Sequence, residues 1–142
     1  MILYFDTSAL MKLFVDERHS DTMRSTSLAS TRLIVSQLTL AEMCAGMSLK
    51  QRTGQVEAPL AATALQELRE QWPRYYRLGI DGNLVATAGE LALRFGLRAY
   101  DSVQLASAQR AHEQLGTNLT FCCLSQQLNA AASTLAITVL PQ

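Results

Sequence analysis

The chain of 142 residues is long enough for one globular domain with a buried core. Hydrophobic residues make up 49% of the sequence and charged residues 17%, a balance that excludes a disordered chain. The 12 basic and 12 acidic side chains cancel, so any contact with a nucleic acid must come from a local patch and not from the field of the whole protein.

The N-terminal segment and the cysteines give no sign of export. The opening apolar run ends at Asp6, which is too short for a signal peptide, and no apolar run approaches the length of a membrane span. Cys44, Cys122 and Cys123 lack a CxxC spacing and cannot all pair, so we expect buried free thiols in a reducing cytoplasm. The two histidines are too far apart in sequence to indicate a zinc site.

Apolar runs and helical periodicity alternate along the chain. In order, we predict a strand at 2–5, a short helix at 8–13, a strand at 33–35, helices at 37–50, 58–71, 84–95 and 102–115, and strands at 119–124 and 137–140. Asp81 is predicted to open the helix at 84–95, and Gly96 and Gly116 to end the last two helices. The strands are continuously apolar, as in a parallel sheet covered by helices on both faces. We therefore expect one α/β domain over residues 1–142.

Asp6 directly follows the first predicted strand. A carboxylate at the carboxyl end of a buried strand faces the crevice where open α/β sheets bind ligands. Asp is also a good N-cap for the short helix that follows, and capping and metal binding are compatible.

Glu42 lies on the predicted helix at 37–50, between two apolar faces. One face carries Leu38, Ala41, Ala45 and Leu49, and the other carries Leu40, Met43, Cys44 and Met47. Because the helix is apolar on both sides, we expect it to be largely buried. A buried glutamate requires a partner, because an unpaired buried charge is costly. The partner is either an arginine or a metal ion.

Asp101 precedes the predicted helix at 102–115, where N-capping again offers a structural explanation. Three carboxylates brought together by the fold would repel one another unless a cation joined them. Asp6, Glu42 and Asp101 together therefore indicate a metal site.

Other charged residues are less informative. The segment 74–77, RYYR, has a composition suited to stacking unpaired bases, but a helix end with tyrosines packed on the core is the favoured interpretation. Lys12 and Arg98 lie near the acids in sequence and are better candidates for phosphate contacts. Asp16, Glu17 and Asp81 are interpreted as surface or capping acids.

Four segments together resemble the PIN-domain family, and within it the VapC-like toxins of bacterial toxin–antitoxin pairs. The opening FDTSAL at 5–10 resembles the start of the family, and TLAE at 39–42 resembles its second acid on a helix. The strongest match is the block at 91–106, LALRFGLRAYDSVQLA. The tail at 121–124, followed by 128–132, also fits. The four segments follow the family's order and span nearly the whole chain.

The resemblance implies a PIN-like three-layer sandwich, with a short, mostly parallel sheet of four to five strands flanked by helices. It also implies an endoribonuclease that depends on Mg²⁺ or Mn²⁺, with Asp6, Glu42 and Asp101 as the catalytic and metal-binding acids. Hard divalent cations prefer such oxygen ligands, and a bound ion would orient and acidify a water. Ser8 resembles the family's hydroxyl beside the first aspartate, where it would support that acid or contact phosphate; a helix-capping serine is the alternative.

Ser125 is a departure from the family pattern. The family usually places a fourth acid just after the fourth strand, three residues before the leucine that matches Leu128. The Ser125 hydroxyl can hold a metal-bound water or contact phosphate but brings no charge, so a second cation site would be weakened more than the first. The alternative function is therefore a catalytically weakened PIN fold that binds RNA or an antitoxin.

The resemblance also implies partners. We expect an RNA substrate, a VapB-like antitoxin and a homodimer, with no membrane association. An aspartyl phosphotransferase with Asp6 as nucleophile is a further rival, but Ser8 stands where the haloacid-dehalogenase pattern requires a second acid.

Overall fold

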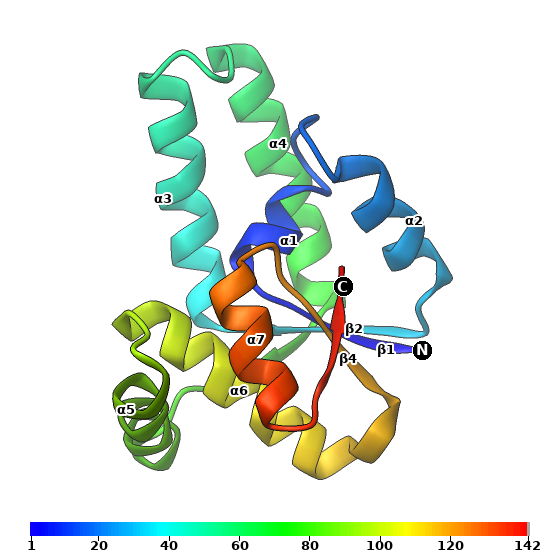
Figure 1. Ribbon diagram of the computed structural model, residues 1–142. Helices are drawn as coiled ribbons and strands as arrows, with labels where there is room; N and C mark the ends of the chain where they lie inside the picture. The colour runs from blue at the N-terminus through cyan, green and yellow to red at the C-terminus, as the bar shows by residue number, and fades with distance from the viewer. Residues whose placement is uncertain (142) are drawn as a thin grey trace.

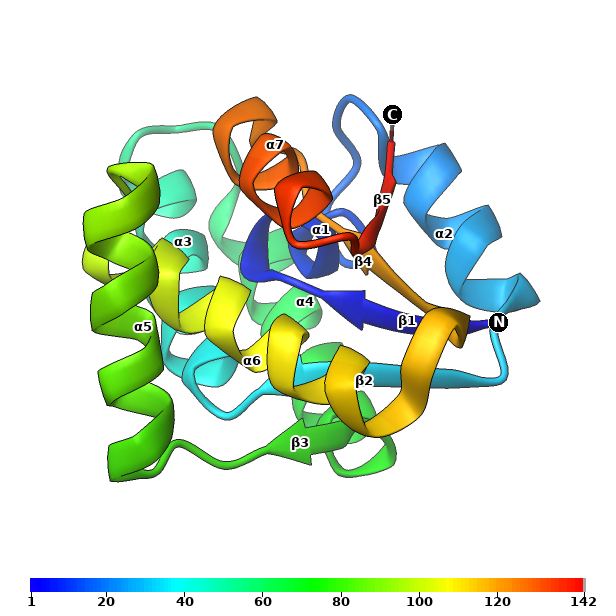
Figure 2. The same cartoon turned by 60° about the horizontal axis from the view of Figure 1, so that its bottom comes forward.

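The computed structural model describes residues 1–141 and shows a five-stranded parallel sheet between two layers of helices (Figure 1, Figure 2). Every pair of neighbouring strands is parallel, and the strand order is β3-β2-β1-β4-β5. The predicted α/β sandwich with a four- to five-stranded sheet is confirmed. The strands are β1 (Ile2–Phe5), β2 (Arg32–Ser36), β3 (Tyr76–Leu78), β4 (Leu119–Cys122) and β5 (Thr138–Leu140).

Seven α-helices lie within the described residues, on the two faces of the sheet. They are α1 (Thr7–Met11), α2 (Ser20–Ala29), α3 (Leu38–Arg52), α4 (Ala58–Gln71), α5 (Gly82–Phe95), α6 (Ala99–Leu115) and α7 (Gln126–Thr134). Two short 3-10 turns, Trp72–Arg74 and Gly116–Asn118, follow α4 and α6. None of these helices combines the length and apolar character that a membrane crossing requires.

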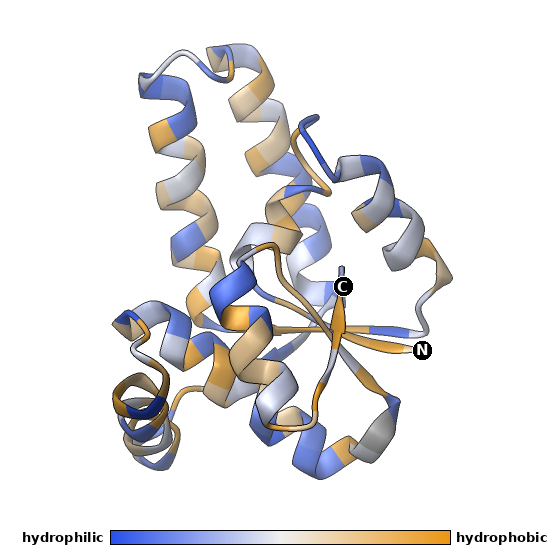
Figure 3. Ribbon diagram, in the orientation of Figure 1, coloured by the Kyte–Doolittle hydropathy of each residue, from blue (hydrophilic) through white to orange (hydrophobic). Residues whose placement is uncertain are grey.

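Successive side chains of β1 pack alternately into two separate hydrophobic cores, one on each face of the sheet. Leu3 and Phe5 pack with α1, α2, α3 and α4 on one face of the sheet. Tyr4 points to the opposite face and packs with α5, α6 and α7. Figure 3 shows the apolar strands at the centre and hydrophilic residues on the outer parts of the helices. Burial on both faces explains the continuously apolar strands in the sequence.

Most of the predicted helix caps are present. The Asp6 side chain caps α1 and the Asp81 side chain caps α5, each by accepting a hydrogen bond from a backbone amide three residues further on. Gly96 ends α5 with a left-handed φ of 67°, which glycine adopts without strain, and Gly116 ends α6. The N-cap interpretation of Asp101 is wrong, because α6 begins two residues before it.

Two elements differ from the sequence-based prediction. The segment 76–78 belongs to no helix end and forms β3, an edge strand in which only Leu78 is buried. Helix α2 is absent from the prediction because it buries only Ser20 and Met23, and so lacks the apolar periodicity by which a helix is recognised.

The expectation that the Glu42 helix is largely buried is also wrong. Helix α3 buries Thr39, Met43 and Met47, while its opposite side is open and Leu49 is half exposed. Cys44 lies on this open side, so one of the three free thiols is exposed and not buried. Some apolar residues of α3 lie in the core and others face outward, and the amino-acid composition of the helix does not show which are which.

Candidate functional site

Asp6 occupies the junction between β1 and α1 and is only 5% exposed. Its amide continues the sheet by donating to the Cys122 carbonyl at 3.1 Å. Its Oδ1 accepts hydrogen bonds from the Ser8 hydroxyl at 2.7 Å and from the Ala9 amide at 3.0 Å. The carboxylate is therefore held rigidly by neutral donors at the carboxyl end of the central strand.

The surroundings of Asp6 disfavour its charged form. Burial raises the pKa of Asp6 above its usual range and nearby Glu42 adds to the rise, while hydrogen bonds from Cys123, Ser8 and the Ala9 amide oppose it. Burial and the neighbouring Asp6 also raise the pKa of the Cys123 thiol. The thiol thus remains protonated and can donate to the carboxylate.

Glu42 reaches this junction from the first turns of α3. Its Oε1 accepts hydrogen bonds from the Thr7 hydroxyl at 2.8 Å and from the Gln104 amide at 2.8 Å. No arginine or lysine pairs with it among residues 1–141. The predicted arginine alternative is therefore wrong, since neutral groups hold Glu42 and leave its charge uncompensated.

Gln104 links three residues of the site by hydrogen bonds, and the sequence analysis did not identify it as a site residue. Its side chain is 2% exposed, and its Nε2 donates to the Thr39 hydroxyl at 2.9 Å as well as to Glu42. The Tyr4 hydroxyl donates to its Oε1 at 2.7 Å, which fixes the orientation of the amide. A polar residue next to Leu105 on a buried stretch of helix was the available signal.

Asp101 lies one turn before Gln104 on α6, but its carboxylate pairs with Arg98 at 3.3 Å. In the part of the chain that the structure describes, no three His, Cys, Asp or Glu side chains lie close enough together to hold a metal ion. The structure thus brings Asp6 and Glu42 together, with Asp101 on the adjacent helix end and turned to its own arginine.

The donor set of this site fits a hard divalent cation. Asp6 and Glu42 accept hydrogen bonds from neutral donors only, and within residues 1–141 no protein hydrogen bond occupies the second oxygen of Glu42. Two neighbouring carboxylates without a compensating positive charge repel each other, which a cation would relieve. Oxygen ligands of this kind suit Mg²⁺ or Mn²⁺.

Comparison with known proteins identifies the fold to which this site belongs. The model of the PIN domain family matches residues 3–118. The chain belongs to the PIN-domain family. Ribonuclease VapC46 from Mycobacterium tuberculosis is 30% identical over 138 residues, which cover 97% of this chain and 95% of that protein.

Two solved structures share this PIN fold. The sarcin–ricin loop cleaving toxin VapC20 from M. tuberculosis has a TM-score of 0.66 at 16% identity, covering 91% of this chain and 94% of that one. A toxin–antitoxin complex from Klebsiella pneumoniae has a TM-score of 0.60 at 19% identity, covering 87% and 86%. The resemblance to VapC-like PIN domains noted in the sequence is confirmed.

The two predicted serines have different roles in this PIN domain: Ser8 holds Asp6, and Ser125 caps a helix. Besides donating to Asp6, the Ser8 hydroxyl accepts a hydrogen bond from the Leu124 amide at 3.1 Å and so ties the end of β4 to the site. Asp6, and not Ser8, caps α1. Ser125 caps α7 by accepting from the Leu128 amide at 3.3 Å, so the position of the family's fourth acid has a structural use here.

The other predicted charged residues pair with carboxylates other than Asp6 and Glu42. Lys12 donates to Glu17 at 2.7 Å, and Lys50 donates to the other oxygen of the same carboxylate at 2.9 Å. Arg98 contacts Asp101 from an almost fully exposed position. In segment 74–77, Tyr75 packs edge-on against Trp72, as the core-packing interpretation predicts, whereas the neighbouring tyrosine is half exposed on β3.

Proposed function

We propose that this PIN domain is a VapC-like endoribonuclease that depends on Mg²⁺ or Mn²⁺ and hydrolyses RNA phosphodiesters. The observation that carries the proposal is the pair formed by Asp6 and Glu42, two rigidly held carboxylates with no cationic partner among the described residues. A relative that is called a ribonuclease and matches nearly the whole chain supports the same activity.

Asp6, Glu42 and Asp101 would hold the cation. When bound, it would supply Lewis-acid chemistry, lowering the pKa of a water and offsetting the charge that develops on the phosphate. Ser8 and the Ala9 amide keep Asp6 in one orientation, while Thr7 and Gln104 do the same for Glu42. This preorganisation spares the site from reorganising when substrate arrives.

Moving the Asp101 carboxylate from Arg98 to the cation would cost little free energy. Its ion pair with Arg98 is largely exposed, because the arginine side chain is 91% accessible, and exposed pairs contribute only about 0.2–1 kcal/mol. Release of Asp101 toward its fellow acids would free Arg98 to contact an RNA phosphate. Lys12 would make a similar contact where substrate displaces Glu17.

An antitoxin and a second copy of the chain are the expected protein partners. A structural neighbour is a toxin–antitoxin complex, which supports a VapB-like antitoxin for this protein. The open apolar side of α3, with Cys44 and the half-exposed Leu49, offers a surface for a homodimer. We place the RNA-cleaving activity in the cytoplasm, where an intracellular toxin meets its substrates.

Incubation of purified, antitoxin-free protein with a mixed pool of structured RNAs tests this function. Cleavage is expected with Mg²⁺ or Mn²⁺, to be absent with EDTA, and to give fragments with 5′-phosphate and 3′-hydroxyl ends. The fragment ends identify the target sequence. Folded protein that cuts no RNA with either metal would refute the nuclease.

A second candidate is a catalytically weakened PIN fold that binds RNA or an antitoxin. The observation that favours it is Ser125, whose hydroxyl caps α7 at the place of the fourth acid. Ser125→Asp restores a charge and retains a capping side chain. A large gain in cleavage over wild type would support the weakened form, whereas an unchanged rate would show that three acids suffice.

A further inference from the structure

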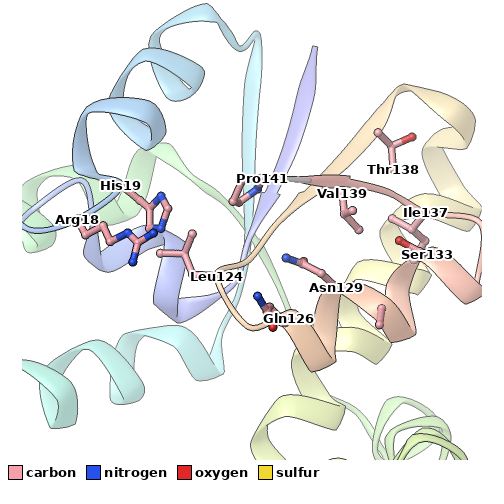
Figure 4. A pocket seen from close by; sticks show the side chains of 11 residues that line it. Arg18, His19, Leu124, Gln126, Asn129, Ser133, Ile137, Thr138, Val139 and Pro141 are labelled. Atoms are coloured by element: carbon pink, nitrogen blue, oxygen red, sulfur yellow. The ribbon is translucent and has the colours of Figure 1, made fainter.

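A groove of about 740 Å³ runs along the outer side of the β4–α7 turn, between the segment that precedes α2 and the edge strand β5 (Figure 4). Arg18 and His19 form one wall. Gln126, Asn129 and Ser133 from the α7 side form the other, and β5 closes the far end with Val139. A hollow of this size accommodates a ligand as large as a nucleotide.

The groove begins beside the acid site. Gln126 directly follows Ser125, and Leu124 lines the groove while its amide donates to Ser8. Ser8 in turn donates to Asp6 at 2.7 Å. A strand of nucleic acid whose phosphate lay at the carboxylates would reach this groove by following the β4–α7 turn.

The charges that line the groove suit a polyanion. Arg18 is exposed on its wall, and none of the lining side chains among residues 1–141 is acidic. Three other hollows, which border α2 or α4, each contain at least two carboxylates, such as Glu57 and Glu67 in the largest of them. Arg18 and His19 border both this groove and one of those hollows, where they lie with Asp16, Glu17 and Asp21. On its own side the groove offers a phosphate one cation and no carboxylate among the described residues.

His19 is held in an unfavourable backbone conformation at the groove wall. Its φ of 73° lies in the left-handed region, which costs free energy for a residue with a side chain. It precedes α2 as N-cap residue without making a side-chain capping bond, and its ring is exposed. The fold thus retains a strained histidine whose imidazole is available for stacking on a base.

Asn129 provides a polar group on the facing wall. Its Nδ2 donates to the Cys123 carbonyl at 2.7 Å, while its Oδ1 is buried and has no hydrogen-bond partner in the described chain. Asn129 thus ties α7 to the end of β4 on this side of the groove.

We propose that this groove binds the unpaired nucleotide next to the scissile phosphate, with Arg18 on the backbone and His19 stacked on the base. The proposal rests on the ribonuclease function above and assigns one flank of its RNA substrate to the surface formed by the β4–α7 turn, the α2 approach and β5.

Binding is measured by fluorescence anisotropy with a short, labelled single-stranded RNA, in the non-cleaving Asp6→Asn background with Mg²⁺. Arg18→Gln removes the groove's cation, and Ala130→Trp fills the groove from an exposed position on α7. Each should weaken binding about tenfold, the loss expected for one stacked base or one phosphate contact. Arg18→Gln should also lower the slope of log affinity against log salt by about 0.7. The matched control is Arg69→Gln on exposed α4, which should leave both quantities unchanged.

His19→Gly separates binding from a structural role. Glycine relieves the left-handed backbone strain, so the melting temperature should rise while RNA affinity falls about tenfold. A purely structural histidine would move stability without moving affinity. Groove variants that bind RNA as tightly as the Arg69→Gln control would overturn the proposal.

Cleavage by otherwise wild-type protein, measured in parallel, distinguishes the two levels of failure. If wild type cleaves RNA in a metal-dependent manner while the groove variants bind RNA as tightly as the control, the nuclease function stands and only the groove proposal is refuted. Absence of both cutting and RNA binding in wild type would refute the nuclease and the groove together.

Discussion

The acid pair Asp6–Glu42 and the Lys12–Glu17–Lys50 cluster both lie at helices α1 and α3. The carboxylate of the cluster has cationic partners, whereas the two carboxylates of the acid pair have only neutral ones. Glu17 accepts from two lysine ammonium groups, whose side chains are only 15% and 19% exposed. Partial burial would raise the pKa of Glu17, but its hydrogen bonds and charge attraction with Lys12 and Lys50 outweigh that effect and lower it. Asp6 is almost fully buried, meets only neutral donors and has a raised pKa.

The difference shows which carboxylates the fold pairs with cations and which it leaves without a cationic partner. A carboxylate with two ammonium partners is electrostatically satisfied and contributes to stability. Two adjacent carboxylates with hydroxyl, thiol and amide partners are destabilising when ionised, an arrangement typical of functional sites. The contrast is therefore a physical argument for a cation site that does not depend on the family.

The largest expected effect is on cleavage. Asp6→Asn and Glu42→Gln preserve the hydrogen-bond acceptors but remove the charge, so RNA cleavage should fall by about 100- to 1000-fold. Glu17→Gln makes the same chemical change in the neutralised cluster and should leave the rate within about threefold of wild type. Initial rates on one RNA substrate in saturating Mg²⁺ measure all three. Equal losses in the three variants would contradict the comparison.

A smaller loss is expected where the support of Glu42 is removed. Gln104→Leu deletes the amide that donates to Glu42 and Thr39, and should reduce cleavage by about 10- to 100-fold. Tyr4→Phe removes only the hydrogen bond that orients that amide and should cost less. Half-maximal Mg²⁺ concentration is the decisive measurement, because a positioning role raises it while a packing defect lowers stability alone. Gln114→Leu, at an exposed place on the same helix, is the control.

The pH dependence of stability separates the two regions by sign. The folded-state pKa of Asp6 is raised, so its ionisation destabilises metal-free protein increasingly as pH rises above the unfolded value of about 3.9. Asp6→Asn should therefore raise the melting temperature by a few degrees at pH 8 in EDTA, and the difference should vanish below pH 4. The pKa of Glu17 is lowered, so its stabilisation is present above about pH 4.3 and is lost as pH falls through its folded value.

Thermal unfolding in EDTA between pH 3 and pH 8 measures both variants against wild type. Glu17→Gln should be less stable than wild type at neutral pH and approach it in acid, opposite to Asp6→Asn. Added Mg²⁺ should stabilise wild type and not Asp6→Asn, since a ligand that binds only the folded state raises its melting temperature. Parallel pH profiles for the two variants would remove the distinction between the two carboxylates.

The sequence was sufficient for the sheet and for the positions of the acids, but not for their partners. Continuous apolar strands and a carboxylate directly after the first of them locate Asp6 at the carboxyl edge of the sheet. Gln104 and Tyr4 lie 100 residues apart, and only the packing of α6 on β1 brings them together. Helical periodicity likewise placed Glu42 between apolar residues but did not reveal that one side of α3 is open.

The smallest expected effect is within the lysine cluster itself. Glu17→Gln and Lys50→Met should each lower the free energy of unfolding by about 0.5–1 kcal/mol, and their combination should cost less than the sum, because both remove one ion pair. The losses should shrink in high salt, since the cluster is partly exposed. Arg24→Met breaks the more exposed pair with Asp16 and should change stability less. Additive losses would mean that Glu17 and Lys50 act independently. Glu17 would then not be stabilised by this ion pair, and its contrast with the unpaired Asp6 would fail.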